Sequence, residues 1–93
     1  MEYKELELKH LSMVNYDKYF ISTIRIEVRH LWLNQQSDLF VYETMVFKTK
    51  NDNVVYHEPI LNQRYESYEK AITGHQNVVD DIKKIVKDNL KSD

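Results

Sequence analysis

The residues best suited to acid–base chemistry are Glu43 and His75. Glu43 interrupts an apolar alternation in a predicted strand, and His75 lies on the apolar stripe of a predicted helix. If that strand face meets the helix, the buried carboxylate needs a partner, which His75 or Arg64 would supply. Such a pair is either a general base with its orienting group or a structural polar pair that fixes helix register. We favour the structural pair and expect no enzyme activity, because the sequence has no nucleophile motif or phosphate-binding loop.

Metal chemistry has little support in the sequence. The four histidines are far apart and form no H-x-x-x-H ligand pair: His10, His30, His57 and His75. There is no cysteine, so zinc sites with thiolate ligands and disulfides are excluded. The absence of cysteine also fits a reducing compartment. We therefore expect neither a metal nor a cofactor.

A second group of residues has the character of a recognition surface, since arginine and tyrosine dominate binding hot spots. The candidate partner-binding residues are Arg25, Arg29, Tyr42, Tyr56, Arg64 and Tyr65. The same side chains could stack on and grip a nucleotide, which leaves a ligand-binding alternative open. Amphipathic tyrosines at the margin of a core would explain many of the chain's 7 tyrosines without any binding role.

Length and charge restrict the classes of function. With 93 residues the chain is expected to form a single domain over residues 1–93. A formal net charge of −2 provides no field that would draw it to nucleic acid or to anionic membranes, so we expect neither to be bound directly. No apolar run is long enough to span a membrane and residues 1–5 do not resemble a secretion signal, which favours a cytoplasmic location.

Alternation of apolar and polar residues predicts a small antiparallel sheet of three to four strands. The β pattern is strongest over 20–33, where Phe20, Ile24 and Ile26 share the parity expected to face the core. The returning strand, 39–48, is apolar on both parities, so both of its faces need covering. Residues 54–56 form a short further strand, 3–14 a weaker one, and 60–66 a crossing segment. Polar turns are expected at 15–18, 34–38 and 50–53.

The last third of the chain predicts one long amphipathic helix from Ser67 to Lys91, packed on the sheet in an α+β fold. Its apolar residues follow steps of three and four: Tyr68, Ala71, Ile72, His75, Val78, Val79, Ile82, Ile85, Val86 and Leu90. Ser67 is the expected N-cap. Gly74 is the only glycine, and we expect helix and sheet to approach so closely there that a larger residue would not fit.

The predicted elements are longer than the domain. Fourteen strand residues reach about 45 Å, whereas a compact chain of this size is roughly 32 Å across. The first hairpin must therefore twist sharply or project, and one helix covers only one face of the sheet. We expect self-association, most simply as a dimer, or binding of a partner.

In its second half the chain resembles a group of small, mostly uncharacterised bacteriophage proteins. The resemblance rests on the ordered combination E-T-M-V-F at residues 43–47, R-Y at 64–65 and A-x-x-G-H at 71–75, within about residues 40–86. The resemblance implies a phage-encoded protein made in the cytoplasm of an infected bacterium. It implies no shared catalytic mechanism.

These observations favour a non-catalytic accessory protein that binds and inhibits a bacterial host factor. The leading specific form is an anti-defence protein, such as an anti-CRISPR inhibitor. The first alternative is an oligomer that sequesters a nucleotide signal with Arg25, Arg29 and Arg64. The second alternative is a small hydrolase or nuclease that uses Glu43 and His75.

Overall fold

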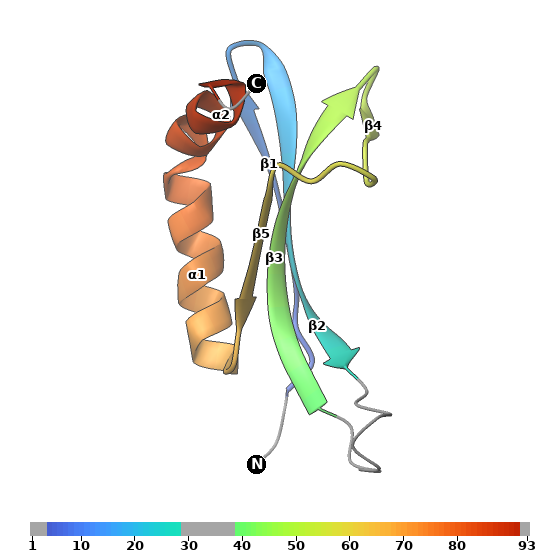
Figure 1. Cartoon of the computed structure of the whole chain (residues 1–93), viewed down its shortest axis with the longest axis vertical. Coiled ribbons are helices and arrows are strands. Elements are labelled where there is room, and N and C mark those ends of the chain that lie inside the picture. Colours follow the sequence, from blue (N-terminus) through green and yellow to red (C-terminus); the bar gives the residue numbers. More distant parts are fainter. Residues whose placement is uncertain (1–3, 29–38, 92–93) are drawn as a thin grey trace.

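In the computed structural model, which describes residues 4–28 and 39–91, five strands form an antiparallel sheet and two helices lie on one side of it (Figure 1). The strands are β1 (Glu7–Val14), β2 (Asp17–Val28), β3 (Leu39–Lys50), β4 (Asn53–Val54) and β5 (Leu61–Tyr65). The helices are α1 (Tyr68–Asp80) and α2 (Ile82–Lys91). The strand order is β1-β2-β3, with β4 and β5 paired to successive parts of the free edge of β3. The predicted α+β class with an antiparallel sheet is confirmed.

Strand β5 occupies the segment that we expected only to cross over to the helix. It pairs with β3 from Tyr42↔Tyr65 to Val46↔Leu61. Its pattern is weak because only Leu61 and Tyr65 are half-buried, while the three residues between them are polar and exposed. The sheet therefore continues beyond β4, which is shorter than the strand predicted at 54–56, and β5 follows it along the same edge of β3.

Two tight turns fix the strand register. Asn15 and Tyr16 have φ of 51° and 73°, and Asn51 and Asp52 have φ of 53° and 64°. Two-residue loops with positive φ at both positions match the right-handed twist of paired strands. The turns predicted at 15–18 and 50–53 are confirmed, whereas the loop predicted at 34–38 lies outside the described residues.

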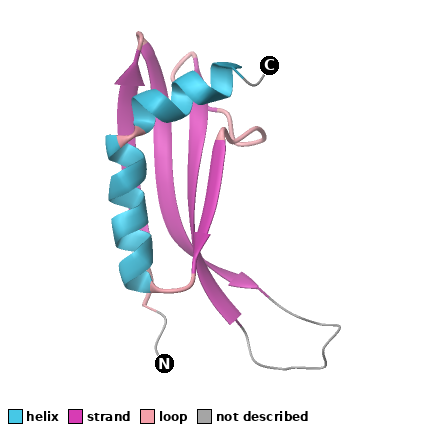
Figure 2. Cartoon of the chain, turned by 60° about the vertical axis from the view of Figure 1, so that its left-hand side comes forward, coloured by secondary structure: helices cyan, strands magenta, loops and turns pink. Residues whose placement is uncertain are grey.

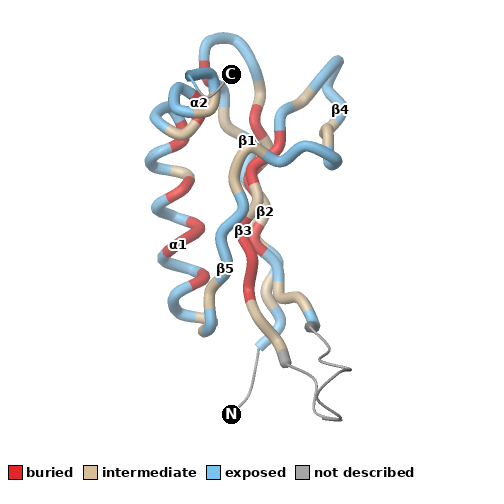
Figure 3. The backbone as a smooth tube through the Cα atoms, in the orientation of Figure 1, coloured by how far each residue is buried: buried red, intermediate tan, exposed pale blue. Residues whose placement is uncertain are grey.

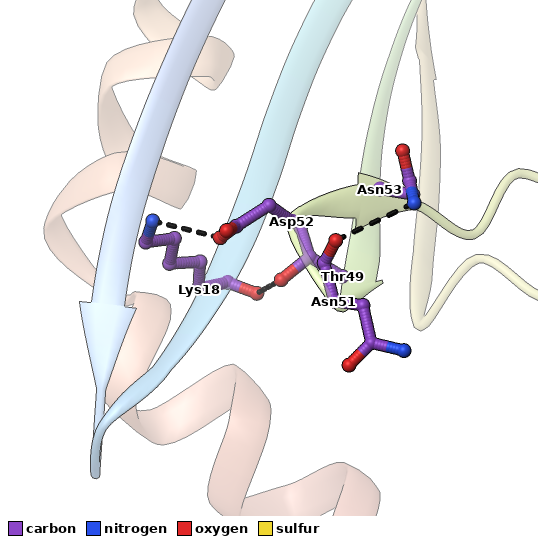
Figure 4. Close-up of polar contacts among 5 residues, drawn as sticks. All are labelled: Lys18, Thr49, Asn51, Asp52 and Asn53. Atoms are coloured by element: carbon purple, nitrogen blue, oxygen red, sulfur yellow. Dashed lines mark hydrogen bonds and ion pairs between the residues drawn. The ribbon is translucent and has the colours of Figure 1, made fainter.

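The second turn is also tied to β2 by side chains (Figure 4). The Thr49 hydroxyl donates to the Lys18 carbonyl over 2.9 Å, and Lys18 Nζ lies 2.9 Å from Asp52 Oδ1. Asn53 Nδ2 donates to the Asn51 carbonyl within the turn at 3.4 Å. These contacts hold the β3–β4 turn beside the start of β2.

The predicted helix is present, but it is divided at Asp81. Ser67 is the N-cap as predicted, since its Oγ accepts from the Lys70 N–H at 3.2 Å. At Asp81 the backbone leaves helical geometry (φ −96°, ψ 10°), and α2 runs in a different direction from α1 across the end of the sheet (Figure 2). The change of direction lets Ile82 and Val86 pack near Val14 at the end of β1, where a straight helix would continue past the sheet.

The core lies between the helices and the facing sheet surface, where buried residues line the inner sides of α1, β2 and β3 (Figure 3). Its cluster consists of Val14, Tyr19, Ile21, Val46, Val78, Ile82 and Val86. The predicted parity of β2 is wrong: Ile21 and Thr23 are fully buried, while Ile24 is 38% exposed on the opposite face. Both parities of β2 carry good strand formers, and a buried threonine is tolerated where its hydroxyl is hydrogen-bonded.

Gly74 is buried in α1, and a Cβ there would collide with the ring of Tyr65 on β5. The predicted close approach of helix and sheet at this glycine is confirmed. The expectation of elements longer than a compact body also holds, since the principal extents are 47 × 26 × 23 Å. In Figure 1 the lower end of β3 extends beyond α1.

Ile82→Ala tests how α2 is anchored. Ile82 is 7% exposed within the core cluster, so truncation should lower the free energy of unfolding by about 2–5 kcal/mol. Ile72→Ala is the matched control on α1, because Ile72 is 37% exposed and should cost much less. Urea denaturation of both variants gives the comparison, and equal losses would contradict the described packing.

Candidate functional site

The face of the sheet turned away from the helices, here called the open face, carries apolar side chains from three strands. Alternation along paired strands assigns it the odd-numbered residues of β1 and β3 and the even-numbered residues of β2. Its apolar members with described side chains are Leu11, Met13, Phe20, Ile24, Ile26, Val41, Met45 and Phe47. Leu11 is 55% exposed and Met13 61% exposed, so part of this face is accessible.

Aromatic rings cluster on the part of the open face nearer the β1–β2 turn. Phe20 and Phe47 are cross-strand partners whose ring centroids lie 6.4 Å apart. Tyr56, from the segment after β4, packs edge-on to Phe47 at 5.1 Å while remaining 65% exposed. Phe47 is thereby buried, although no helix covers it. Leu11, the β1 partner of Phe20, extends this row to the edge of the sheet.

One ion pair lies on the same face, further along β3. Glu43 is only 8% exposed, and its Oε2 accepts from Arg64 Nε at 3.0 Å. The two residues are direct partners across β3 and β5, so the register of the sheet places them together. A cross-strand partner of opposite charge is what a carboxylate on a largely apolar face requires.

On the helix-facing side, a buried polar chain links the sheet to α1. The Thr23 and Thr44 hydroxyl oxygens lie 2.5 Å apart, and Thr23 Oγ1 lies 2.7 Å from His75 Nδ1. In the neutral His75 tautomer that carries its proton on Nε2, Thr44 donates to Thr23 and Thr23 donates to Nδ1, so each hydroxyl hydrogen has an acceptor. Among the side chains that the structure describes, no buried polar atom is left without a partner.

Burial lowers the pKa of His75 below its ordinary value of 6.5, and the neighbouring His10 lowers it further. The neutral form of the imidazole therefore persists to lower pH than in an unfolded chain. Protonation would make Nδ1 a donor and would require the hydroxyl chain to reverse. His75 thus forms a buried hydrogen bond to Thr23, and its buried position disfavours the protonated imidazolium.

The hypothesised Glu43–His75 pair does not form. Glu43 and Thr44 are consecutive in β3, so their side chains point to opposite faces, and it is Thr44 that belongs to the His75 chain. Glu43 instead takes Arg64, its other candidate partner. A general base and its orienting group cannot be assembled from two residues on opposite sides of a sheet.

The six candidate partner-binding residues do not form one surface. Tyr56 and Arg64 belong to the open face. Tyr42 is 1% exposed, and its hydroxyl donates to the Lys4 carbonyl at 2.7 Å. Tyr42 is thus a core residue, because the helices cover the even-numbered side of β3. Arg29 lies outside the described residues.

The remaining two candidates also lie on the helix-facing side. Arg25 has its guanidinium carbon 4.5 Å from the ring centroid of Phe40 and an Nη2 atom 3.6 Å from Glu5 Oε1. Tyr65 packs against Gly74 and donates to Gln63 Oε1 at 2.9 Å. Arginine and tyrosine type alone did not identify the accessible face, whereas the two-sided apolar pattern of β3 is the signal that pointed to it.

Within residues 4–28 and 39–91, the structure has no group of three histidine, aspartate or glutamate side chains placed to hold a metal ion. No helix in that part of the chain is both long and apolar enough to cross a membrane. Comparison with protein-family models, curated proteins and solved structures gives no match.

Tyr42→Ala should behave as a core truncation. Loss of a fully buried aromatic ring should lower the free energy of unfolding by about 3–5 kcal/mol. Tyr42→Phe, which removes only the hydrogen bond to Lys4, should cost about 1 kcal/mol. Tyr56→Ala is the partly exposed comparison: its ring is 65% exposed but packs edge-on to Phe47, so its loss should cost only about 0.5–1.5 kcal/mol. A stable Tyr42→Ala variant would contradict the assignment of Tyr42 to the core.

The lowered pKa of His75 predicts weaker folding in mild acid. The unfolded chain takes up the proton near pH 6.5, before the folded chain does, so the unfolding free energy falls as pH drops through 6.5. Urea denaturation between about pH 7.5 and about pH 5.5 measures this slope, in a range where carboxylates stay ionised. His75→Gln should flatten the slope, while His57→Gln, at an exposed position, should leave it unchanged. If His75→Gln kept the wild-type slope, His75 would not be the group that makes the unfolding free energy depend on pH.

Proposed function

We propose that this chain is a non-catalytic binding protein that holds a protein partner against the open face of its sheet. The observation that carries the proposal is the exposure of Leu11, Ile24 and Tyr56 on a face that neither helix covers. Contiguous accessible apolar surface is uncommon on monomers and marks interaction sites. The helices already occupy the other side, so this face has no partner among the described elements.

The chemistry of the open face is that of an interface. It carries an aromatic row made by Phe20, Phe47 and Tyr56, and aromatic residues are enriched at interfaces. Charged pairs lie on the same face: the Glu7–Lys9 pair at 2.9 Å on β1 and the Glu43–Arg64 pair toward β5. Aromatic and apolar side chains together with charged pairs favour a protein surface over a small molecule.

We propose a bacterial host factor as the partner, with a component of a defence system such as CRISPR as the leading form. Support comes from the resemblance of residues 43–47, 64–65 and 71–75 to bacteriophage proteins. In that setting the chain acts in the cytoplasm of the infected cell and inhibits the host factor by covering part of its surface. A second copy of the chain is the alternative occupant of the open face, which would make the protein a dimer.

The two other functions gain less support from the geometry. A nucleotide cage built from Arg25 and Arg64 would need both on one side, but they lie on opposite faces of the sheet and each has a carboxylate neighbour. Hydrolysis by Glu43 and His75 meets the same obstacle. Binding a partner on the open face does not require these residues to lie on the same side of the sheet.

The double variant Leu11→Glu/Tyr56→Ala tests the open face. Both side chains are more than half exposed, so the variant should stay folded with a modestly lower melting temperature, because Tyr56 also packs on Phe47, while binding a partner about tenfold or more weakly. Tagged wild type and variant are compared in pull-downs from a bacterial lysate, beside light scattering of the purified proteins. The expected result is one stoichiometric host protein with the wild type only.

Ile72→Glu is the matched control, since it also introduces a carboxylate at a partly exposed apolar position, but on α1. It should retain the host protein. Equal retention by the open-face variant would contradict the proposed surface. A purified dimer that the double variant converts to monomer, with no captured protein, would assign the open face to a second copy instead.

A further inference from the structure

A groove lies at the end of the sheet, between α2 and the β1–β2 turn. Its volume is about 640 Å³. Four lining residues come from the end of β1 and the turn, Met13, Val14, Asn15 and Tyr16, and four from α2, Lys83, Val86, Lys87 and Leu90. The change of helix direction at Asp81 creates this groove, because it carries α2 across the end of the sheet (Figure 2).

The groove is apolar at its base and accessible at its margins. Val14 and Val86 are buried members of the core cluster and form its floor. Met13, Tyr16 and Leu90 are among the most exposed large apolar side chains of the described residues, with Tyr16 95% exposed. Such side chains around a concave base can close on a bulky apolar group from another molecule.

The charged groups that line the groove are cations. Lys83 and Lys87 are one helical turn apart, so they lie on the same side of α2. Among the described residues neither makes an ion pair, in contrast to Lys9 and Lys18, and no aspartate or glutamate lines the groove. This local positive charge opposes the net charge of −2 of the chain.

We propose that this groove binds a short acidic segment of another protein, with a bulky apolar side chain between carboxylates. The apolar side chain lies on Val14 and Val86, and the carboxylates meet Lys83 and Lys87. Lys83 and Leu90 are about 10 Å apart along the helix axis, the length of about three extended residues. The lining is thus matched in charge and length to a peptide motif. The groove shares only Met13 with the open face.

The test uses the full chain, labelled with ¹⁵N, and the blocked hexapeptide Asp-Glu-Phe-Leu-Asp-Glu. Amide shifts should change at residues 13–16 and 83–90, while the part of the open face away from Met13, around Ile24, Met45 and Tyr56, should be unaffected. The cationic hexapeptide Lys-Lys-Phe-Leu-Lys-Lys should not bind. Lys83→Gln/Lys87→Gln should weaken binding of the acidic peptide about three- to tenfold, as expected for two exposed ion pairs.

Lys84→Gln/Lys91→Gln is the matched control, because it removes the same charge from the same helix at positions that do not line the groove. It should leave the affinity nearly unchanged. An equal loss in both double variants would overturn the proposal, since non-specific attraction would then explain binding. Shifts outside the groove, or co-sedimentation with phosphatidylglycerol vesicles without peptide binding, would also overturn it, the latter in favour of a membrane surface.

Discussion

Strand β3 carries apolar side chains on both faces, and this constraint determines much of the molecule. Helices on one side of a sheet can bury only one of those faces. The even-numbered side, with Tyr42 and Val46, lies under the helices and joins the core. The odd-numbered side relies on Phe20 and on Tyr56 to cover Phe47, and the rest remains accessible. The open face therefore follows from the amino-acid pattern of one central strand.

The same strand explains how the polar residues are distributed. Thr44 points toward α1 and completes the hydroxyl chain with Thr23 and His75, whereas the adjacent Glu43 points away and meets Arg64. Two polar contacts, one residue apart in sequence, thus stabilise opposite sides of the sheet. Each is satisfied by a cross-strand or helix partner.

The fold was predictable where local signals were strong. Both two-residue turns, the N-cap at Ser67 and the close approach at Gly74 follow from residue type alone. The parity of β2 was not predictable, because apolar residues occur on both of its faces and burial of Thr23 depends on His75, 52 positions away in sequence. Strand β5 and the helix break at Asp81 likewise depend on tertiary pairing and packing.

The candidate site shows the same division. The two-sided pattern of β3 indicated that a second face needs a partner, but the choice of Tyr42 as a contact residue required knowing which side the helices cover. Leu11 and Ile24 are ordinary strand residues whose exposure results only from the position of the sheet. Residue type predicted an apolar surface outside the core, and topology determines which side of the sheet carries it.

The first turn has an energetic consequence of its own. Tyr16 has a φ of 73°, a left-handed conformation that costs a bulky L-residue about 1 kcal/mol or more relative to glycine. Its ring is 95% exposed, so burial returns little of that cost. A glycine at Tyr16 would make a more stable hairpin. The protein thus maintains at this tip an aromatic side chain that folding alone does not favour, as expected where a residue is selected for contact with another molecule.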